Sequence, residues 1–263
     1  MLFSSKKHQN YLPFAVVTDN NIPMNIIFDA SYRAFLRLFT KPFRTMFWRS
    51  ILVTISLLAV LWIAIRHVFL LYGAPMLESF LPGLPHWLSW LSLVAFFTFG
   101  IGLAILLAFL ITPITAFIGS FFVDEAIKII ETTEYPHDIP GNAMEFTPAL
   151  LLSLRFFLVS LLANIFVFLL IFFPPVHMVA FFLVNSYLLG KEYFILNALR
   201  FHDKYTAEKI YLLNKKPILA AGFLIALFIS IPFLNLLTPL FAAAQMAYLY
   251  KNLHKKQKML PEA

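Results

Sequence analysis

Long stretches without a charged residue are the feature that most constrains how this chain can fold. Three of them are Ile51–Ile65, Trp87–Phe122 and Phe156–Gly190, and they approach or exceed the roughly 20 apolar residues of a membrane-spanning helix. Charged residues make up only 13% of the 263 residues, against roughly 25% in soluble globular proteins. A soluble helical protein would need far more polar surface. The sequence therefore predicts an all-α integral membrane protein.

The sequence lacks the residues that several kinds of metal, redox and catalytic sites require. The chain has no cysteine, which excludes disulfides, thiolate metal sites, iron–sulfur clusters and thiol catalysis. Its seven histidines are never three or four residues apart, and it has neither a phosphate-binding loop for ATP nor a readable catalytic triad. We therefore expect no enzyme activity, no metal and no cofactor. The first 30 residues also lack the pattern of a cleavable signal peptide.

The basic residues lie outside the apolar stretches. Of the 20 lysines and arginines, seven precede Ser50, five lie in the segment Arg200–Lys216 and four lie from Lys251 onward, whereas the connection after the first span has only Arg66. Because cytoplasmic loops are enriched in Lys and Arg, we expect both termini and the Arg200–Lys216 loop in the cytoplasm. Basic groups beside spans attract anionic lipids, at about 1 kcal/mol per charge. We therefore expect anionic lipids and no nucleic acid as partners.

The pattern of apolar residues predicts the first two spans. Apolar side chains recur at helical spacing over Asn25–Phe47, with arginines among them, which predicts an interfacial helix that feeds the first span. Spans are expected at about Ser50–Leu71 and Trp87–Ile111. The apolar pattern continues past Pro113 and runs into charged residues as far as Glu131. We therefore expect one long second helix that projects into the cytoplasm.

Acidic residues gather at the end of that second helix. Asp124, Glu125, Glu131 and Glu134 are the nearest approach to a carboxylate cluster in the chain. We interpret them as a solvated acidic face that contacts the basic loop Arg200–Lys216, and not as a catalytic or metal site.

Two helical hairpins are predicted in the C-terminal half, each with both ends on the basic side of the membrane. The first covers Pro148–Leu199 and folds back at Phe172–Met178. Its arms of about 23 residues are long enough to span, and the sequence leaves open whether it crosses or dips. The second covers Pro217–Leu249 and folds back within IPFLNLLTP, Ile231–Pro239.

The second hairpin breaks where no water is expected. Its first arm, Ile218–Ile231, has 14 residues, about 21 Å of helix, which is short of the roughly 30 Å hydrocarbon core. We therefore predict a re-entrant hairpin with Pro232, Asn235 and Pro239 at its tip. Irregular backbone at that depth needs protein or water around it, and in transporters such breaks aim helix ends at anions. In the alternative interpretation the prolines only make a tight turn and Asn235 satisfies a freed carbonyl.

A row of polar side chains follows the second arm of the first hairpin. Its members share one helix face or a neighbouring stripe: Asn185, Ser186, Glu192, Tyr193, Asn197 and Arg200. In one interpretation they line a polar path, with Arg200 attracting anions at its cytoplasmic mouth. In the other, Glu192 and Arg200 anchor the helix at the interface and the remaining residues form helix–helix hydrogen bonds.

Motifs in three stretches follow one another along the chain. They lie in Thr112–Glu131, in Asn185–His202 and in Ile231–Tyr250, which begins with Ile-Pro-Phe-Leu-Asn and continues to a second proline. In their order and spacing they resemble the CysZ/EI24 family of bacterial inner-membrane proteins. The resemblance covers about Arg33 to Leu253.

The resemblance implies an architecture and an activity. It implies two long transmembrane helices, two helical hairpins that dip partway into the bilayer, and a homo-oligomer that shields their broken ends. The single membrane domain would cover residues 25–253, between cytoplasmic tails at residues 1–24 and 254–263. The implied activity is uptake of sulfate, or a related small oxyanion, for cysteine biosynthesis, without ATP hydrolysis by this chain.

Two positions depart from the family pattern. The family's sulfate permeases have an arginine pair near the start of the first membrane helix, whereas here Arg44 and Arg49 are five positions apart. The family's Asn-Gly after the proline of helix two is Thr115-Ala116 here, after Pro113. These departures leave open a branch of the family with another anion or with no known substrate. The competing hypothesis is a non-transporting membrane scaffold. The lack of a charged residue deep in any span favours the scaffold, and Asn235 between two helix breakers favours the permease.

Overall fold

The structure is a computed structural model. It describes residues 24–73 and 122–258 and, between them, Pro75, Trp90, Val94, residues 97–105, Leu107, Ile114 and Ile118. Every regular element in these parts of the chain is a helix, as predicted. Three of the helices are long and apolar enough to cross a membrane, and a bent pair of helices could form a fourth span. The chain is therefore a helical membrane protein.

The first two helices meet at a sharp break. Helix α1 covers Met24–Leu38 and α2 covers Lys41–Val68, so the prediction of one interfacial helix over Asn25–Phe47 is wrong in its C-terminal third. Thr40 has extended backbone (φ −74°, ψ 150°) and caps α2, and its hydroxyl donates to the carbonyl oxygen of Arg37 at 2.6 Å. Pro42 is the second residue of α2, where it is tolerated because the N–H groups of the first turn have no partner within the helix.

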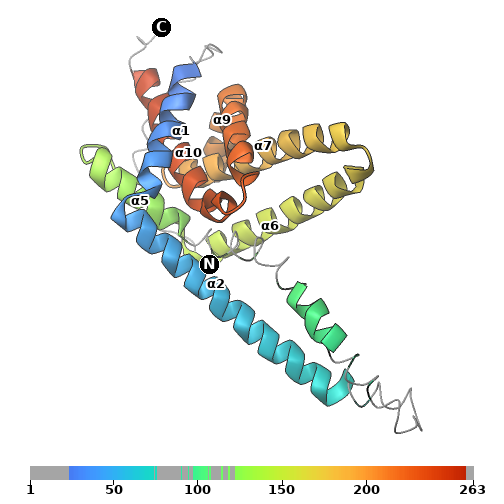
Figure 1. Ribbon diagram of the computed structural model, residues 1–263. Coiled ribbons are helices and arrows are strands. Elements are labelled where there is room, and N and C mark those ends of the chain that lie inside the picture. Colours follow the sequence, from blue (N-terminus) through green and yellow to red (C-terminus); the bar gives the residue numbers. More distant parts are fainter. Residues whose placement is uncertain are drawn as a thin grey trace, which may run out of the picture.

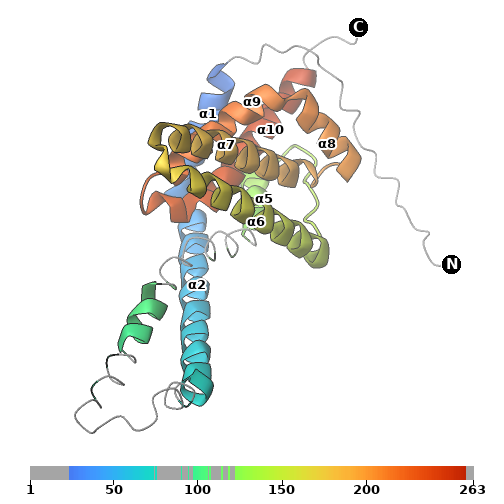
Figure 2. The same cartoon turned by 90° about the vertical axis from the view of Figure 1, so that its right-hand side faces the viewer.

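Most of helix α2 projects away from the helices of the C-terminal half (Figures 1 and 2). With the π-helical turn η1, Phe69–Gly73, it forms a candidate span of 33 residues, and only 6% of the 18-residue apolar window within it is buried. Residues 97–105 are helical and lie beside its far half, where the Phe99 ring stacks on Phe69 at 3.6 Å. Most of the predicted second span lies outside the described residues. The next described helix, α5, covers Val123–Glu134.

Helices α6 and α7 fold back on each other as a long hairpin (Figure 1). Helix α6 covers Phe146–Leu169 and α7 covers Pro174–Ala198, joined by the short 3₁₀ helix η3, Leu170–Phe172. The turn is narrower than predicted, because two prolines begin α7 directly after Phe173.

The second hairpin starts from a right-angled corner. Helix α8, Lys204–Leu213, is capped by the Asp203 side chain and meets α9, Lys215–Ile229, at 87°. After the turn come the 3₁₀ helix η4, Leu234–Leu237, and α10, Thr238–Lys258. Helix α10 therefore extends into the segment predicted to be the C-terminal tail.

Helix α10 is the centre of the packed head. It contacts α1, α5, α7 and α9, which gather around it in Figure 1. The consecutive residues of its middle are all buried: Ala242, Ala243, Ala244, Gln245, Met246, Ala247, Tyr248 and Leu249. Such a helix is apolar on every side because it is covered on every side. The Gln245 amide is held by the Ser31 hydroxyl at 2.8 Å and the Ala221 carbonyl at 3.1 Å.

Helices α7 and α9 cross at two glycines. A Cβ atom on Gly222 would collide with the carbonyl oxygen of Ser186 and lie 3.0 Å from the Cα atom of Gly190. A Cβ atom on Gly190 would lie 2.8 Å from the carbonyl oxygen of Ile218. Small residues let helix backbones approach closely in membranes. This crossing holds the first arm of the second hairpin against the second arm of the first.

Candidate functional site

The polar row on α7 is buried and makes contacts between helices. The Asn185 amide donates to the side-chain oxygen of Asn164 on α6 at 3.2 Å, and the Ser186 hydroxyl donates to the Phe182 carbonyl of its own helix. The Asn197 amide donates to the Tyr193 carbonyl at 2.9 Å and reaches the α10 backbone. The two asparagine contacts are the helix–helix hydrogen bonds of the alternative interpretation. A polar path along this face stays a prediction.

Glu192 differs from its neighbours on α7. It is half-buried, and its Oε1 atom is buried without a hydrogen-bond partner among the described residues. Tyr193 next to it is buried. A role for either residue along a substrate path stays a prediction.

Arg200, directly after α7, binds two carboxylates of α5. Its guanidinium donates to both oxygens of Glu131, at 3.1 and 3.0 Å, and to Asp124 at 2.7 Å. Only 2% of the side chain is exposed. Burial would lower the pKa of Arg200, but these carboxylates raise it above its ordinary value. In this arrangement the guanidinium ties the end of α7 to α5, and a role of Arg200 in attracting anions stays a prediction.

The acidic residues of α5 are therefore only partly the solvated face that we predicted. Glu131 is buried in the pair with Arg200, which is the predicted contact with the basic segment. Glu134 binds the Arg37 guanidinium at 3.0 Å and accepts a hydrogen bond from the Tyr248 hydroxyl. These pairings hold α5 against α1, α7 and α10 because a carboxylate entering the protein needs a charged or hydrogen-bonding partner.

The break in the second hairpin lies at an exposed tip. Pro232 is in the turn, Asn235 is half-buried in η4, and Pro239 is in the first turn of α10. The Asn235 backbone N–H donates to the Ile231 carbonyl at 3.2 Å, whereas its side-chain amide bonds to no described residue. The carbonyl of Ile231, next to the break, thus accepts from the backbone N–H of Asn235 and not from the side-chain amide of Asn235. Phe233 has φ 66°, a strained value for a residue other than glycine.

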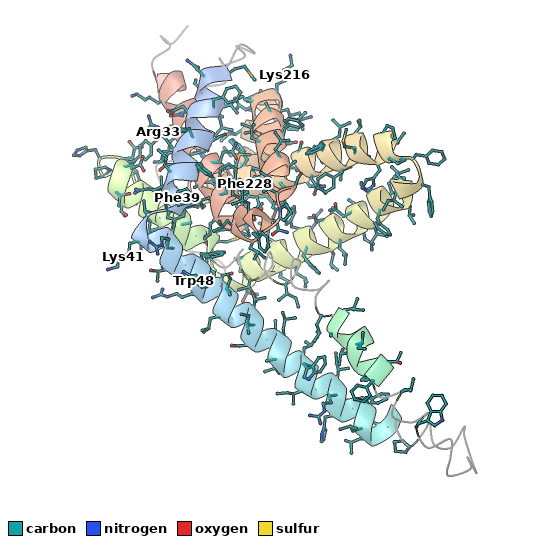
Figure 3. All side chains as sticks on the ribbon, viewed as in Figure 1. Arg33, Phe39, Lys41, Trp48, Lys216 and Phe228 are labelled. Carbon is teal, nitrogen blue, oxygen red and sulfur yellow. The ribbon has the colours of Figure 1, made fainter. Side chains whose placement is uncertain are left out.

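A concave basic surface lies at the start of α2. Its cavity of about 650 Å³ is lined by Lys41, Arg44, Thr45, Trp48, Arg49 and Leu52; we call these residues the α2 basic surface. Figure 3 shows Lys41 and Trp48 on this end of α2, close to the break after Phe39. Arg49 lies 3.8 Å from Glu125. Lys41 and Arg44 are exposed and form no ion pair with the residues that the structure describes.

The structure does not describe the other two predicted site residues. Pro113 and Thr115 lie outside the described residues. Of the rest, Asn185, Ser186 and Tyr193 are buried on α7, and Arg200 is buried just after the end of that helix. No group of His, Asp and Glu suited to a metal ion occurs in the described part of the chain.

Sequence reasoning missed a second pocket, between α7, α8 and α9. It has a volume of about 300 Å³, and its polar lining is Ser186, Tyr187, Lys191, Glu208, Tyr211 and Lys215. The sequence did contain a signal for shared helix faces. Tyr187 and Lys191 lie four apart on α7, and Glu208 and Tyr211 lie three apart on α8. That the two helices face each other could not be read from the sequence.

The described part of the chain thus has the fold of a helical membrane protein. A basic surface lies at the start of α2, its first long apolar helix. The protein-family model described as sulfate transporter CysZ/etoposide-induced protein 2.4 matches residues 30–239. The chain belongs to this family. A search among curated proteins gives no significant match.

Proposed function

We propose that the chain is a permease for sulfate or a related small oxyanion in the bacterial inner membrane. The observation that supports this best is the α2 basic surface, in a chain of a family whose name includes a sulfate transporter. The proposal includes a supply of sulfate for cysteine biosynthesis, with both termini in the cytoplasm.

A permease for a dianion needs donors that replace lost water without holding the ion too tightly. Arg44 supplies a planar guanidinium that binds oxyanions through two parallel hydrogen bonds, and Lys41 supplies a second positive charge. Both are exposed, so an anion bound there keeps part of its water and can leave. We propose this surface as the place where the anion is first bound.

The broken hairpin is the second part of the proposal. We propose that α9 and α10 enter the membrane and return to the same side, with Pro232 and Pro239 at the break and the Asn235 amide directed at the path of the anion. The amide is not used by another described residue, which supports this role. Such a tip needs protein or water around it, so the proposal includes a homo-oligomer whose subunits cover it.

One observation favours the competing hypothesis of a non-transporting scaffold. Three members of the polar row, Asn185, Asn197 and Arg200, hydrogen-bond to other helices. Contacts of this kind hold helices together. Under the scaffold hypothesis the α2 basic surface would bind only lipid.

Uptake of labelled sulfate into liposomes that contain the purified protein separates the two hypotheses. If the proposal holds, Arg44→Ala lowers uptake at subsaturating sulfate about tenfold, because one charge-assisted hydrogen-bonding group is lost. Arg66→Ala is the matched control, because Arg66 is exposed near the other end of the same helix, and it should leave uptake unchanged. Equal losses of sulfate uptake in the two variants would contradict an anion site at Arg44. The variant Asn235→Ala tests the hairpin tip in the same assay.

A further inference from the structure

The pocket between α7, α8 and α9 carries charges of both signs. Lys191 comes from α7, Glu208 from α8 and Lys215 from the start of α9. Three hydroxyl groups, of Ser186, Tyr187 and Tyr211, also line it. The volume of about 300 Å³ is at the lower end for small-molecule sites, roughly 300–1,000 Å³.

These charges do not neutralise one another. Neither lysine forms an ion pair with Glu208 or with any other carboxylate in the described ranges. Instead, the Lys191 ammonium lies over two aromatic rings, 5.8 Å from the centre of Tyr187 and 5.6 Å from that of Tyr211. A pocket that holds two ammonium groups and a carboxylate apart can bind a ligand that carries both charges.

An apolar stripe leads away from the same pocket. Leu219 is part of the lining and is followed on α9 by Phe223 and Leu227, at spacings of four residues that place them on one face. All three side chains are exposed, as is Leu212 on the α8 side of the pocket. The stripe is continuous with the polar pocket, as in a site for a molecule with a charged head and a hydrocarbon tail.

The corner between α8 and α9 suits the surface of a membrane. The 87° bend allows α8 to lie along the surface while α9 turns into the bilayer. Lysines at such a level can keep their ammonium groups at the headgroups while their stems lie along apolar surface. Lys216 marks this end of α9 in Figure 3, and Phe228 marks the end toward the hairpin tip.

We propose that this pocket binds a phosphate ester with a primary amine, and that its source is an aminophospholipid such as phosphatidylethanolamine. Lys191 and Lys215 bind the phosphate, Glu208 accepts hydrogen bonds from the ammonium group, and an acyl chain follows Leu219, Phe223 and Leu227. A headgroup without an amine leaves Glu208 unpaired beside an anion. A free headgroup leaves the apolar stripe uncovered, so the lipid fits the observations better.

Native mass spectrometry of the full-length protein in detergent tests the proposal. Purified protein is titrated separately with phosphatidylethanolamine and phosphatidylglycerol. Wild-type protein should prefer phosphatidylethanolamine. Glu208→Gln should weaken binding of that lipid about tenfold, the effect of one charge-assisted contact, and should not weaken binding of phosphatidylglycerol. Lys191→Gln and Lys215→Gln should weaken both lipids.

The matched controls are exposed residues that do not line the pocket. Lys209→Gln on α8 and Lys216→Gln on α9 remove the same charge at neighbouring positions, and both lipids should bind as to wild-type protein. If Lys216→Gln weakens binding as much as Lys215→Gln, the lipid binds to diffuse charge and the proposal is overturned. Equal binding of the two lipids to wild-type protein also overturns it.

The source of the headgroup is tested by competition. Free phosphoethanolamine and inorganic phosphate are added to the protein loaded with phosphatidylethanolamine. We expect neither to displace the lipid at equal concentration, because neither covers the apolar stripe. Displacement by phosphoethanolamine at equal concentration would overturn the lipid assignment, and displacement by inorganic phosphate would overturn the role of Glu208 as well.

Discussion

Arg200 shows how much a single residue can contribute to the head of this protein. Its guanidinium contacts Glu131 and Asp124 on α5 and the Gly141 carbonyl at 3.3 Å. The Asn142 N–H in turn donates to the Arg200 carbonyl at 2.8 Å. One side chain therefore fixes the end of α7, the helix α5 and the loop that follows α5.

Replacement of Arg200 by methionine should destabilise the protein strongly. The change leaves Glu131 buried without its partner, which costs about 3–5 kcal/mol of unfolding free energy. Thermal unfolding of the detergent-purified variant measures this effect. Arg49→Met is the control, because the Arg49–Glu125 pair is exposed and such pairs contribute about 1 kcal/mol or less. Similar melting temperatures for the two variants would contradict the role of Arg200.

At the scale of residues, the sequence predicts which side chains share a helix face better than it predicts which residues they bind. The spacing of Ser186, Tyr193 and Arg200 predicts that they share a helix face. All three are buried, although α7 ends at Ala198, before Arg200. The partner of Arg200 is Glu131, which lies 69 positions earlier. The sequence predicts that the acidic residues contact the segment Arg200–Lys216, but which carboxylate binds Arg200 depends on how α5 packs.

At the scale of elements, the close crossing of α7 and α9 positions the second hairpin. Gly190 and Gly222 allow the two backbones to approach to a distance at which a single methyl group would collide. The crossing also places Lys191 and Lys215 around the same pocket. The proposed re-entrant hairpin and the proposed lipid-binding pocket therefore both depend on these two glycines.

The change Gly222→Ala should weaken this crossing. The added methyl group meets backbone atoms of α7, which cannot move aside as a flexible side chain would, so we expect a loss of about 1–3 kcal/mol in unfolding free energy. Gly100→Ala is the matched control, since nothing lies within 4 Å of its added Cβ, and helix propensity alone should stabilise that variant slightly. An unchanged melting temperature for Gly222→Ala would contradict the close crossing.

The breaks between elements were predictable where proline marks them strongly. Pro232 and Pro239 predict the interruption between α9 and α10, and the turn and η4 lie there. The break at Thr40 was missed because the apolar pattern continues through Phe39 and Phe43 as if the helix were unbroken. The signal was present in Thr40 and Pro42, a cap and first-turn proline pair, but the apolar pattern outweighed it.

At the scale of the whole molecule, long apolar surfaces are left uncovered. The windows of α2 and α6 that could span a membrane are each only 6% buried. The tips of both hairpins carry very exposed phenylalanines, Phe172 and Phe233. Lipid, neighbouring subunits or both must cover these surfaces. The same apolar residues are the ones from which the sequence predicts an integral membrane protein.

Single cysteines test how deeply the second hairpin enters the membrane. The chain has no cysteine of its own, so each introduced thiol reports one position. For a re-entrant tip, Phe233→Cys should react with a membrane-impermeant maleimide from neither side until detergent is added. The controls Lys255→Cys and Tyr72→Cys are exposed and should react from the cytoplasmic and opposite sides, respectively. Reaction of Phe233→Cys from the same side as Tyr72→Cys would contradict a re-entrant hairpin.

Uptake of labelled sulfate by liposomes that contain the purified full-length protein is the most direct test of the proposed permease. Wild-type protein should give uptake that saturates with sulfate concentration and exceeds that of empty liposomes. Uptake equal to that of empty liposomes, by protein shown to be folded and inserted, would contradict the permease and favour the scaffold.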